Sequence, residues 1–190
     1  MENKRELRKK ILTTRNNMSR EDVENNSILI WDKIINSEIY IKSKVVFIYL
    51  DFKNEVMTFP SIKRMLKEGK RVLVPYTDIV NTKLIPSEIF DERDLVLNPF
   101  GYYEPKTPQP VPLDKIDLVI VPGVAFDEDL NRIGFGKGYY DRILYRLSSR
   151  AKKVAVAHDF QVLNSIPSEE HDVKMDIIVT EKRVIGATLQ

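Results

Sequence analysis

The chain has 190 residues, of which 43% are hydrophobic and 31% charged, with 30 basic and 28 acidic side chains. This length suits a single domain, residues 1–190, and the composition favours a folded chain over a disordered one. Cysteine is absent and histidine occurs twice, which excludes thiolate nucleophiles, cysteine-ligated metal and histidine-rich metal cages. No apolar run could span a membrane, and the first ten residues are charged rather than signal-like, so we expect a cytoplasmic protein without a membrane partner.

The first thirty-five residues predict two helices. Residues 3–18 carry an apolar stripe beside a basic stripe, as in an amphipathic helix. The apolar stripe consists of Leu7, Ile11 and Met18, and the basic stripe of Lys4, Arg8 and Arg15. Ser19 is a typical N-cap for the second helix. The predicted inward residues of that helix are Val23, Ile30, Trp31, Ile34 and Ile35.

Short apolar runs alternate with helices along the rest of the chain. The predicted strands are residues 45–50, 71–76, 116–121, 154–157 and 177–180. Helices are predicted over 61–68, ending before Gly69, and after residue 138. Residues 79–97 are ambiguous, and the proline-rich stretch 99–112 predicts an extended loop. This alternation predicts an α/β fold of three layers, with a twisted, largely parallel sheet between helices and ligands at the carboxyl ends of the strands.

Three of the seven glycines, Gly134, Gly136 and Gly138, lie within five residues between a predicted strand and a predicted helix. Glycine permits positive φ and close approach, and a helix N-terminus presents unpaired N–H groups, so the segment suits an anion. Lys137 and Arg132 would add positive charge against phosphoryl oxygens.

Asp141, in the first turn of the following helix, suits a magnesium ion on the same anion. The spacing fits neither a Walker A loop nor the dinucleotide fingerprint. A tight strand-to-helix connection, with Asp141 serving only the helix dipole, is the structural alternative.

The run from Pro122 to Arg142 resembles the signature of the 5-formyltetrahydrofolate cyclo-ligase family, also called 5,10-methenyltetrahydrofolate synthetases. That signature reads Pro-Gly, Phe-Asp, Arg, then Gly-x-Gly-Lys-Gly-Tyr-Tyr-Asp. Lys4 and Arg8 resemble the family's N-terminal Lys-x3-Arg, and the segment 167–181 resembles its closing Pro-x-x-x-His-Asp with a later Thr-Glu. The resemblance covers essentially the whole chain and implies a Rossmann-like fold of the NagB/RpiA/CoA transferase-like type.

The resemblance implies an ATP-dependent, magnesium-requiring ligase of one-carbon metabolism. Such an enzyme closes 5-formyltetrahydrofolate to 5,10-methenyltetrahydrofolate and releases ADP and phosphate. ATP would phosphorylate the formyl oxygen, and the folate N10 would then attack the activated carbon. We expect a monomer. The alternatives are a regulatory protein that binds nucleotide or folate without turnover and, ranked last, a nucleic-acid binder. No nucleic-acid partner is expected, because acids nearly balance bases and no recognition motif is present.

By the same resemblance, Lys137 and Arg132 are the catalytic residues, and Asp141 and Asp172 bind magnesium. The implied ATP-binding residues are Lys4, Arg5, Arg8, Arg132, Ile133, Gly134, Phe135, Gly136, Lys137, Gly138, Tyr139 and Tyr140. The implied folate-binding residues are Leu50, Glu55, Phe135, Gly136, Lys137, Gly138 and Tyr139.

Several of these positions have plain structural alternatives. The first-helix cations could be solvated, Glu55 could be a solvated loop acid, and Asp172 could be a turn residue. The division of roles between Tyr139 and Tyr140 stays open. His158 stands where the family more often has an aromatic ring, and a structural role is favoured over a catalytic one.

Overall fold

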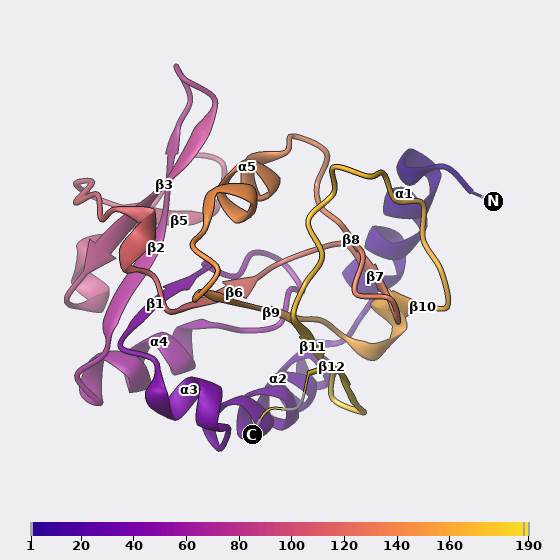
Figure 1. Ribbon diagram of the computed structural model, residues 1–190, viewed down its shortest axis with the longest axis horizontal. Helices are drawn as coiled ribbons and strands as arrows, with labels where there is room; N and C mark the ends of the chain where they lie inside the picture. Colours follow the sequence, from indigo (N-terminus) through magenta and orange to yellow (C-terminus); the bar gives the residue numbers. More distant parts are fainter. Residues whose placement is uncertain (1, 188, 190) are drawn as a thin grey trace.

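The computed structural model describes residues 2–187 and 189, and its centre is a seven-stranded sheet with the order β12-β11-β9-β6-β1-β2-β3 (Figure 1). The strands of this sheet are β1 (Val45–Ile48), β2 (Arg71–Asp78), β3 (Lys83–Ile89), β6 (Leu118–Val121), β9 (Lys152–Val156), β11 (Ile177–Val179) and β12 (Val184–Gly186). The inner pairings are parallel, and only the edge strands β3 and β12 pair antiparallel. The predicted α/β fold with a largely parallel sheet is therefore confirmed.

Helices cover both faces of this sheet. The helices of the described residues are α1 (Lys4–Asn16), α2 (Arg20–Ile35), α3 (Glu38–Lys42), α4 (Phe59–Lys67) and α5 (Tyr139–Arg146), with 3-10 turns η1 (Glu92–Asp94), η2 (Leu113–Lys115) and η3 (Asp159–Gln161). In Figure 1, α2, α3 and α4 lie along one face and α5 lies along the other. Successive residues of β1 point to opposite faces of the sheet, because side chains alternate along a strand. Val46 packs with α2 and α4 on one face, and Phe47 packs with α5 on the other.

The segment 122–138 was expected to be a loop, but it contains the short strands β7 (Ala125–Asp127) and β8 (Arg132–Ile133). With β10 (Val162–Leu163) they form a second, three-stranded sheet. Helix α1 packs on this small sheet through Leu7 and Ile11 (Figure 1). Strands of two or three residues are too short to show a period in the sequence, so the pattern could not reveal them.

Three further expectations are corrected. Helix α1 ends at Asn16, so Met18 lies outside it, and the buried stripe is completed by Arg15 instead. The ambiguous region 79–97 forms β3, η1 and β4 (Leu95–Leu97), and the proline-rich stretch contains β5 (Tyr103–Pro105). Strand β2 continues beyond Pro75, because Pro75 faces Pro86 on β3 and neither position needs an N–H donor there. No helix in the described part of the chain is both long and apolar enough to cross a membrane.

Candidate functional site

A cavity of about 840 Å³ opens where the chain leaves the carboxyl ends of the central strands. Tyr49 and Leu50 enter it directly after β1, and Pro122 enters it directly after β6. The ends of the chain contribute Lys4 from α1 and Asp172 from the loop before β11. The cavity thus lies at the edge of the sheet where ligands of α/β proteins generally bind.

The glycine loop, residues 132–138, forms one wall of this cavity. Gly136 and Gly138 have φ values of +104° and +70°, which disfavour other residues, and Gly138 is the N-cap of α5. A side chain at Gly134 would place a Cβ 2.9 Å from the guanidinium of Arg132. Arg8 holds the loop from α1, since its Nε donates to the carbonyl of Gly134 at 2.8 Å. The glycines are therefore required both for backbone conformation and for close packing against arginines.

Arg132 and Lys137 bring positive charge to the loop in different ways. The side chain of Arg132 is 2% exposed, its Nε donates to the carbonyl of Pro122 at 2.7 Å, and its Nη1 lies 3.4 Å from Oδ1 of Asp141. Burial lowers the pKa of Arg132, and the carboxylate of Asp141 opposes that shift, so the guanidinium stays charged. Lys137 is exposed and forms no ion pair with any described residue.

Lys4 joins the two ends of the chain, because its Nζ lies 3.2 Å from Oδ2 of Asp172. Burial alone would raise the pKa of Asp172, but the N–H of Glu169, at 2.9 Å, and the Lys4 ammonium lower it overall. Asp172 is therefore ionised at neutral pH. Asp141 lines the same cavity, and carboxylate oxygens are the ligands that magnesium prefers.

Glu55 lines a second wall of the cavity, in a segment we call the Glu55 loop, residues 51–58. It is only 8% exposed, and its Oε1 accepts the N–H of Phe52 at 2.8 Å. Burial raises the pKa of Glu55 to about 7, although the charge of Arg15 and the N–H of Phe52 oppose the shift. A buried carboxylate that titrates near neutral pH beside a cavity suits recognition of a ligand that donates hydrogen bonds.

Aromatic side chains that the sequence did not single out complete the cavity. Phe52, Phe100 and Tyr102 line it, with Phe52 meeting Tyr102 edge-on at 6.1 Å and Phe100 stacking on Tyr102 at 6.4 Å between ring centroids. Phe100 is 75% exposed. Flat aromatic surfaces next to a buried carboxylate suit a planar heterocycle with N–H groups at its edge.

The 5-formyltetrahydrofolate cyclo-ligase family model matches residues 1–181. The chain belongs to this family. The Escherichia coli K12 cyclo-ligase is 33% identical over 148 residues, covering 76% of this chain and 81% of the relative. The mouse cyclo-ligase is 30% identical over 189 residues, covering 94% of this chain and 93% of the relative.

Solved cyclo-ligase structures share the fold. The 5,10-methenyltetrahydrofolate synthetase of Aquifex aeolicus superimposes with a TM-score of 0.85 at 36% identity, covering 96% of this chain and 92% of that one. The synthetase of Mycoplasma pneumoniae gives a TM-score of 0.77 at 25% identity, covering 95% of this chain and 99% of that one.

All of the predicted cyclo-ligase site residues except Arg5 line the one cavity. Arg5 follows Lys4 on α1, where one residue turns the helix by about 100°, and it is exposed outside the cavity. The two tyrosines also differ. Tyr140 stacks on Phe47 in the core at 6.1 Å, and its buried hydroxyl has no partner among the described residues, whereas Tyr139 is half-buried at the cavity wall.

Arg15 is the residue whose position the sequence misjudged most. It was expected on a basic stripe with Lys4 and Arg8, but it is 4% exposed, lies over the ring of Phe135 at 5.8 Å, and lowers the pKa of Glu55. Its spacing of seven residues from Arg8 predicts the same side of the helix as Arg8, and that part of the expectation is correct.

Proposed function

We propose that this cavity binds ATP and 5-formyltetrahydrofolate together and is the active site of the chain. As a member of the cyclo-ligase family, the chain is an ATP-dependent ligase that converts 5-formyltetrahydrofolate into 5,10-methenyltetrahydrofolate. The observation that carries the proposal is that the cationic glycine loop and the Glu55 loop line a single cavity of about 840 Å³. This volume lies in the range of small-molecule sites.

The glycine loop and α1 form the ATP side. Backbone N–H groups of the loop and the N-terminus of α5 face the phosphates, as at other helix-terminal phosphate sites. Lys4 and Arg8 are one helical turn apart and both line the cavity, so they add charge from α1. Lys137, which forms no ion pair with a described residue, is free to follow the γ-phosphoryl group.

Glu55 and the aromatic residues form the folate side. The Glu55 carboxylate accepts hydrogen bonds from the amino and ring N–H groups of the pterin, an arrangement that favours a charged acceptor. Leu50 and Phe52 supply apolar and aromatic surface for the flat ring. The folate is thus held by the Glu55 loop and the triphosphate by the glycine loop.

Asp141 and Asp172 would hold magnesium between these two sides. Both carboxylates line the cavity, and Asp172 is ionised at neutral pH, so the donor set fits a hard divalent cation. A magnesium ion held by these two carboxylates would supply positive charge against the phosphoryl oxygens. Lys4 and Arg132 already neutralise these carboxylates in the described structure and would remain beside the ion.

The chemistry follows from the weak reactivity of a formamide, whose carbon is a poor electrophile and whose oxygen is a poor leaving group. The γ-phosphoryl group moves from ATP to the formyl oxygen and ADP leaves. N10 then attacks the carbon and loses its proton, and phosphate departs with the former formyl oxygen. Lys137 and Arg132 stabilise the charge on the transferring group, which is where positioned cations contribute most.

Purified protein incubated with ATP, magnesium and 5-formyltetrahydrofolate should generate the ultraviolet band of the methenyl product with one ADP per turnover. Folate labelled with ¹⁸O in the formyl group should transfer the label to inorganic phosphate. Appearance of the ¹⁸O in water instead of in phosphate would refute the phosphorylation step. Ligand-induced thermal stabilisation without phosphate release would favour the regulatory alternative, and loss of turnover with EDTA, restored by magnesium, would test the metal.

The remaining properties belong to the same proposal. Both ends of the chain, through Lys4 and Asp172, build one cavity, which supports a single catalytic domain over residues 1–190. A complete cavity within one chain supports a monomer, which light scattering tests. A cytoplasmic location is consistent with the absence of cysteine, and fractionation of the source cells tests it.

A further inference from the structure

His158 is fully buried two residues after the end of β9, and both of its ring nitrogens are within hydrogen-bonding distance of a partner. Nε2 lies 2.8 Å from the carbonyl oxygen of Asn54, and Nδ1 lies 3.1 Å from the side-chain nitrogen of Asn26. A carbonyl oxygen can only accept, so the ring carries its proton on Nε2, and Nδ1 then accepts from the Asn26 amide. Burial lowers the pKa of His158, which keeps this neutral form at neutral pH.

Asn54, which receives this hydrogen bond, immediately precedes Glu55. Its side-chain nitrogen donates to the carbonyl of Arg15 in the last turn of α1 at 2.7 Å and to that of Met18, just after the helix, at 3.0 Å. Residue 54 is therefore held on one side by α1 and on the other by His158. Because Glu55 is the next residue, the fixed backbone at residue 54 restricts where its carboxylate can lie. The N–H of Phe52 also donates to Oε1 of Glu55.

The segment that carries His158 is itself anchored near the base of the glycine loop. The N–H of His158 donates to Oε1 of Gln161 at 3.0 Å, which orients the Gln161 amide. Nε2 of Gln161 donates to the carbonyls of Gly123 and Val124 at 3.1 and 3.0 Å. These residues follow Pro122, whose carbonyl accepts from Arg132. His158 thus belongs to a short segment that spans the distance between the two walls of the cavity.

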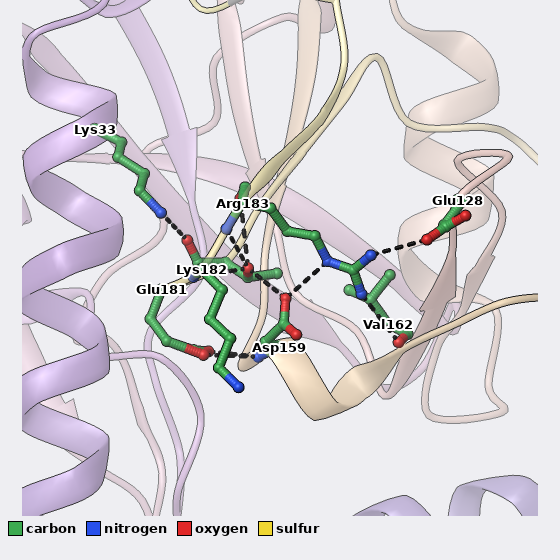
Figure 2. Close-up of polar contacts among 8 residues, drawn as sticks. Lys33, Glu128, Asp159, Val162, Glu181, Lys182 and Arg183 are labelled. Atoms are coloured by element: carbon green, nitrogen blue, oxygen red, sulfur yellow. Dashed lines mark hydrogen bonds and ion pairs between the residues drawn. The ribbon is translucent and has the colours of Figure 1, made fainter.

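Figure 2 shows that Asp159 locks the same segment to the turn after β11. Oδ1 of Asp159 accepts from Oγ1 of Thr180 at 2.7 Å and from Nε of Arg183 at 2.9 Å. The N–H of Asp159 donates to the carboxylate of Glu181 at 2.5 Å, and Arg183 reaches on to Glu128 at 2.9 Å (Figure 2). With its neighbour fixed in this way, the ring of His158 has little freedom to follow the Glu55 loop, so the loop must conform to the ring.

We infer that His158 is a positioning residue for folate binding, which sets the place of Glu55 by holding the carbonyl of Asn54. This inference rests on the proposed folate role of Glu55. His158 does not line the cavity and touches neither substrate site directly. Its hydrogen bond reaches the Glu55 loop but not Lys4, Arg8 or Lys137, so its loss should weaken folate binding selectively and leave ATP binding intact.

Glutamine and asparagine at position 158 each keep one of the two hydrogen bonds of the histidine ring, so the two variants test these bonds separately. In His158→Gln the amide nitrogen reaches the place of Nε2 and keeps the bond to Asn54, whereas in His158→Asn the shorter side chain keeps only the contact with Asn26. We expect His158→Asn to raise the folate KM about tenfold, with kcat and the ATP KM within about twofold, in line with the loss of one buried hydrogen bond. His158→Gln should stay within about threefold of the wild type for folate.

Asn54→Ala is the second variant, and it loosens the same loop from the side of α1 without altering a fully buried residue. It should show the same folate-selective rise. Ser87→Ala is the matched control, because Ser87 is fully buried, its Oγ accepts the N–H of Gln109 at 2.7 Å, and it lies outside the cavity. It should lower the thermal midpoint while leaving both KM values unchanged.

The inference is overturned if His158→Asn and Asn54→Ala leave the folate KM unchanged, or if both KM values rise together in step with lost thermal stability. Equilibrium binding of 5-formyltetrahydrofolate, measured beside turnover, keeps this test apart from the proposed function. Wild-type protein that binds folate but makes no methenyl product removes the proposed activity and leaves the His158 comparison valid. Wild-type protein that binds no folate overturns both.

Discussion

The two walls of the cavity are built on opposite principles. The glycine loop is open: Phe135 is 51% exposed, Lys137 is exposed, and the positive φ angles of Gly136 and Gly138 arrange its backbone. The Glu55 loop is closed: Glu55 is 8% exposed, and the loop donates hydrogen bonds to α1 and α2 and accepts one from His158, which follows β9. The glycine loop thus leaves side chains exposed for a ligand to contact, whereas the Glu55 carboxylate is fixed before a ligand binds.

The difference follows from what each wall must recognise. A triphosphate carries enough charge to order an exposed lysine, and an exposed ammonium loses little hydration before the ligand arrives. A pterin offers only neutral N–H groups, so its acceptor must be buried and fixed in advance to discriminate. Burial raises the pKa of Glu55 to about 7, so the folate wall responds to pH near neutrality.

Lys137→Ala, in the open wall, should have the largest effect on turnover of these substitutions. Because the ammonium acts mainly on the transferring phosphoryl group, kcat should fall about 100- to 1000-fold while the folate KM changes little. Steady-state kinetics with both substrates varied would measure this split. Lys63→Ala, an exposed lysine on α4 outside the cavity, is the control. An equal loss in kcat and in folate affinity would assign Lys137 to ground-state binding instead.

Glu55→Gln should act on the closed wall. Removing the charge weakens the paired acceptor, and the folate KM should rise about tenfold at pH 8 with little change in the ATP KM. The pH profile carries the sharper test. Because the pKa of Glu55 is raised to about 7, the wild type loses the carboxylate as pH falls through 7, and its folate affinity should fall with it.

In Glu55→Gln that pH dependence between pH 6 and 8 should disappear, since the amide does not titrate. The residual pH dependence of Glu55→Gln is the internal control, because it reports every titrating group other than Glu55. A folate profile that is identical in wild type and Glu55→Gln would remove Glu55 from the pocket.

Local spacing predicts two parts of the open wall separately: Gly134, Gly136 and Gly138 follow one another within a few residues, and Lys4 and Arg8 are one turn apart on one helix. The bond from Arg8 to Gly134 that joins these two parts spans 126 positions, so only the family resemblance, which also predicts Leu50 and Glu55, placed them at one site. The closed wall depends on contacts between distant segments. The bond from His158 to Asn54 spans 104 positions, and no local pattern encodes it.

The same distinction explains the errors. Arg15 looked like one more solvated cation, because the ring of Phe135 that covers it comes from a segment 120 positions away. Phe100 and Tyr102 lie in a proline-rich stretch that read as surface loop, and the β4–β5 hairpin, packed beside β2, brings them to the cavity. For Arg15 the expected exposure was wrong, whereas for Phe100 and Tyr102 the position at the cavity was missed.

Arg15→Met tests how the charge of Arg15 affects the pKa of Glu55 in the closed wall. Arg15 is buried, and its charge holds the pKa of Glu55 below the value that burial alone would give. Replacing it with a side chain of similar length should move the midpoint of the folate pH profile upward by roughly half to one pH unit, which weakens folate binding a few-fold at pH 7. Lysine at the same position should restore the midpoint. A midpoint that does not move in Arg15→Met would show that the arginine contributes packing alone.

Arg5→Ala should have the smallest effect, and it tests where the open wall ends. The family resemblance places Arg5 among the ATP contacts, but its exposed side chain lies outside the cavity, whereas Arg8 lines the cavity and bonds to Gly134. We therefore expect the ATP KM to change by less than about twofold in Arg5→Ala and to rise about tenfold in Arg8→Ala, which loses a charge-assisted hydrogen bond as well as a phosphate contact. Both substitutions remove one positive charge from the same helix, so a general electrostatic effect would lower ATP affinity equally in the two variants and would disappear at high salt. A loss confined to Arg8→Ala that persists at high salt would instead mark a direct contact, and a comparable loss in Arg5→Ala would mean that α1 turns or shifts when ATP binds.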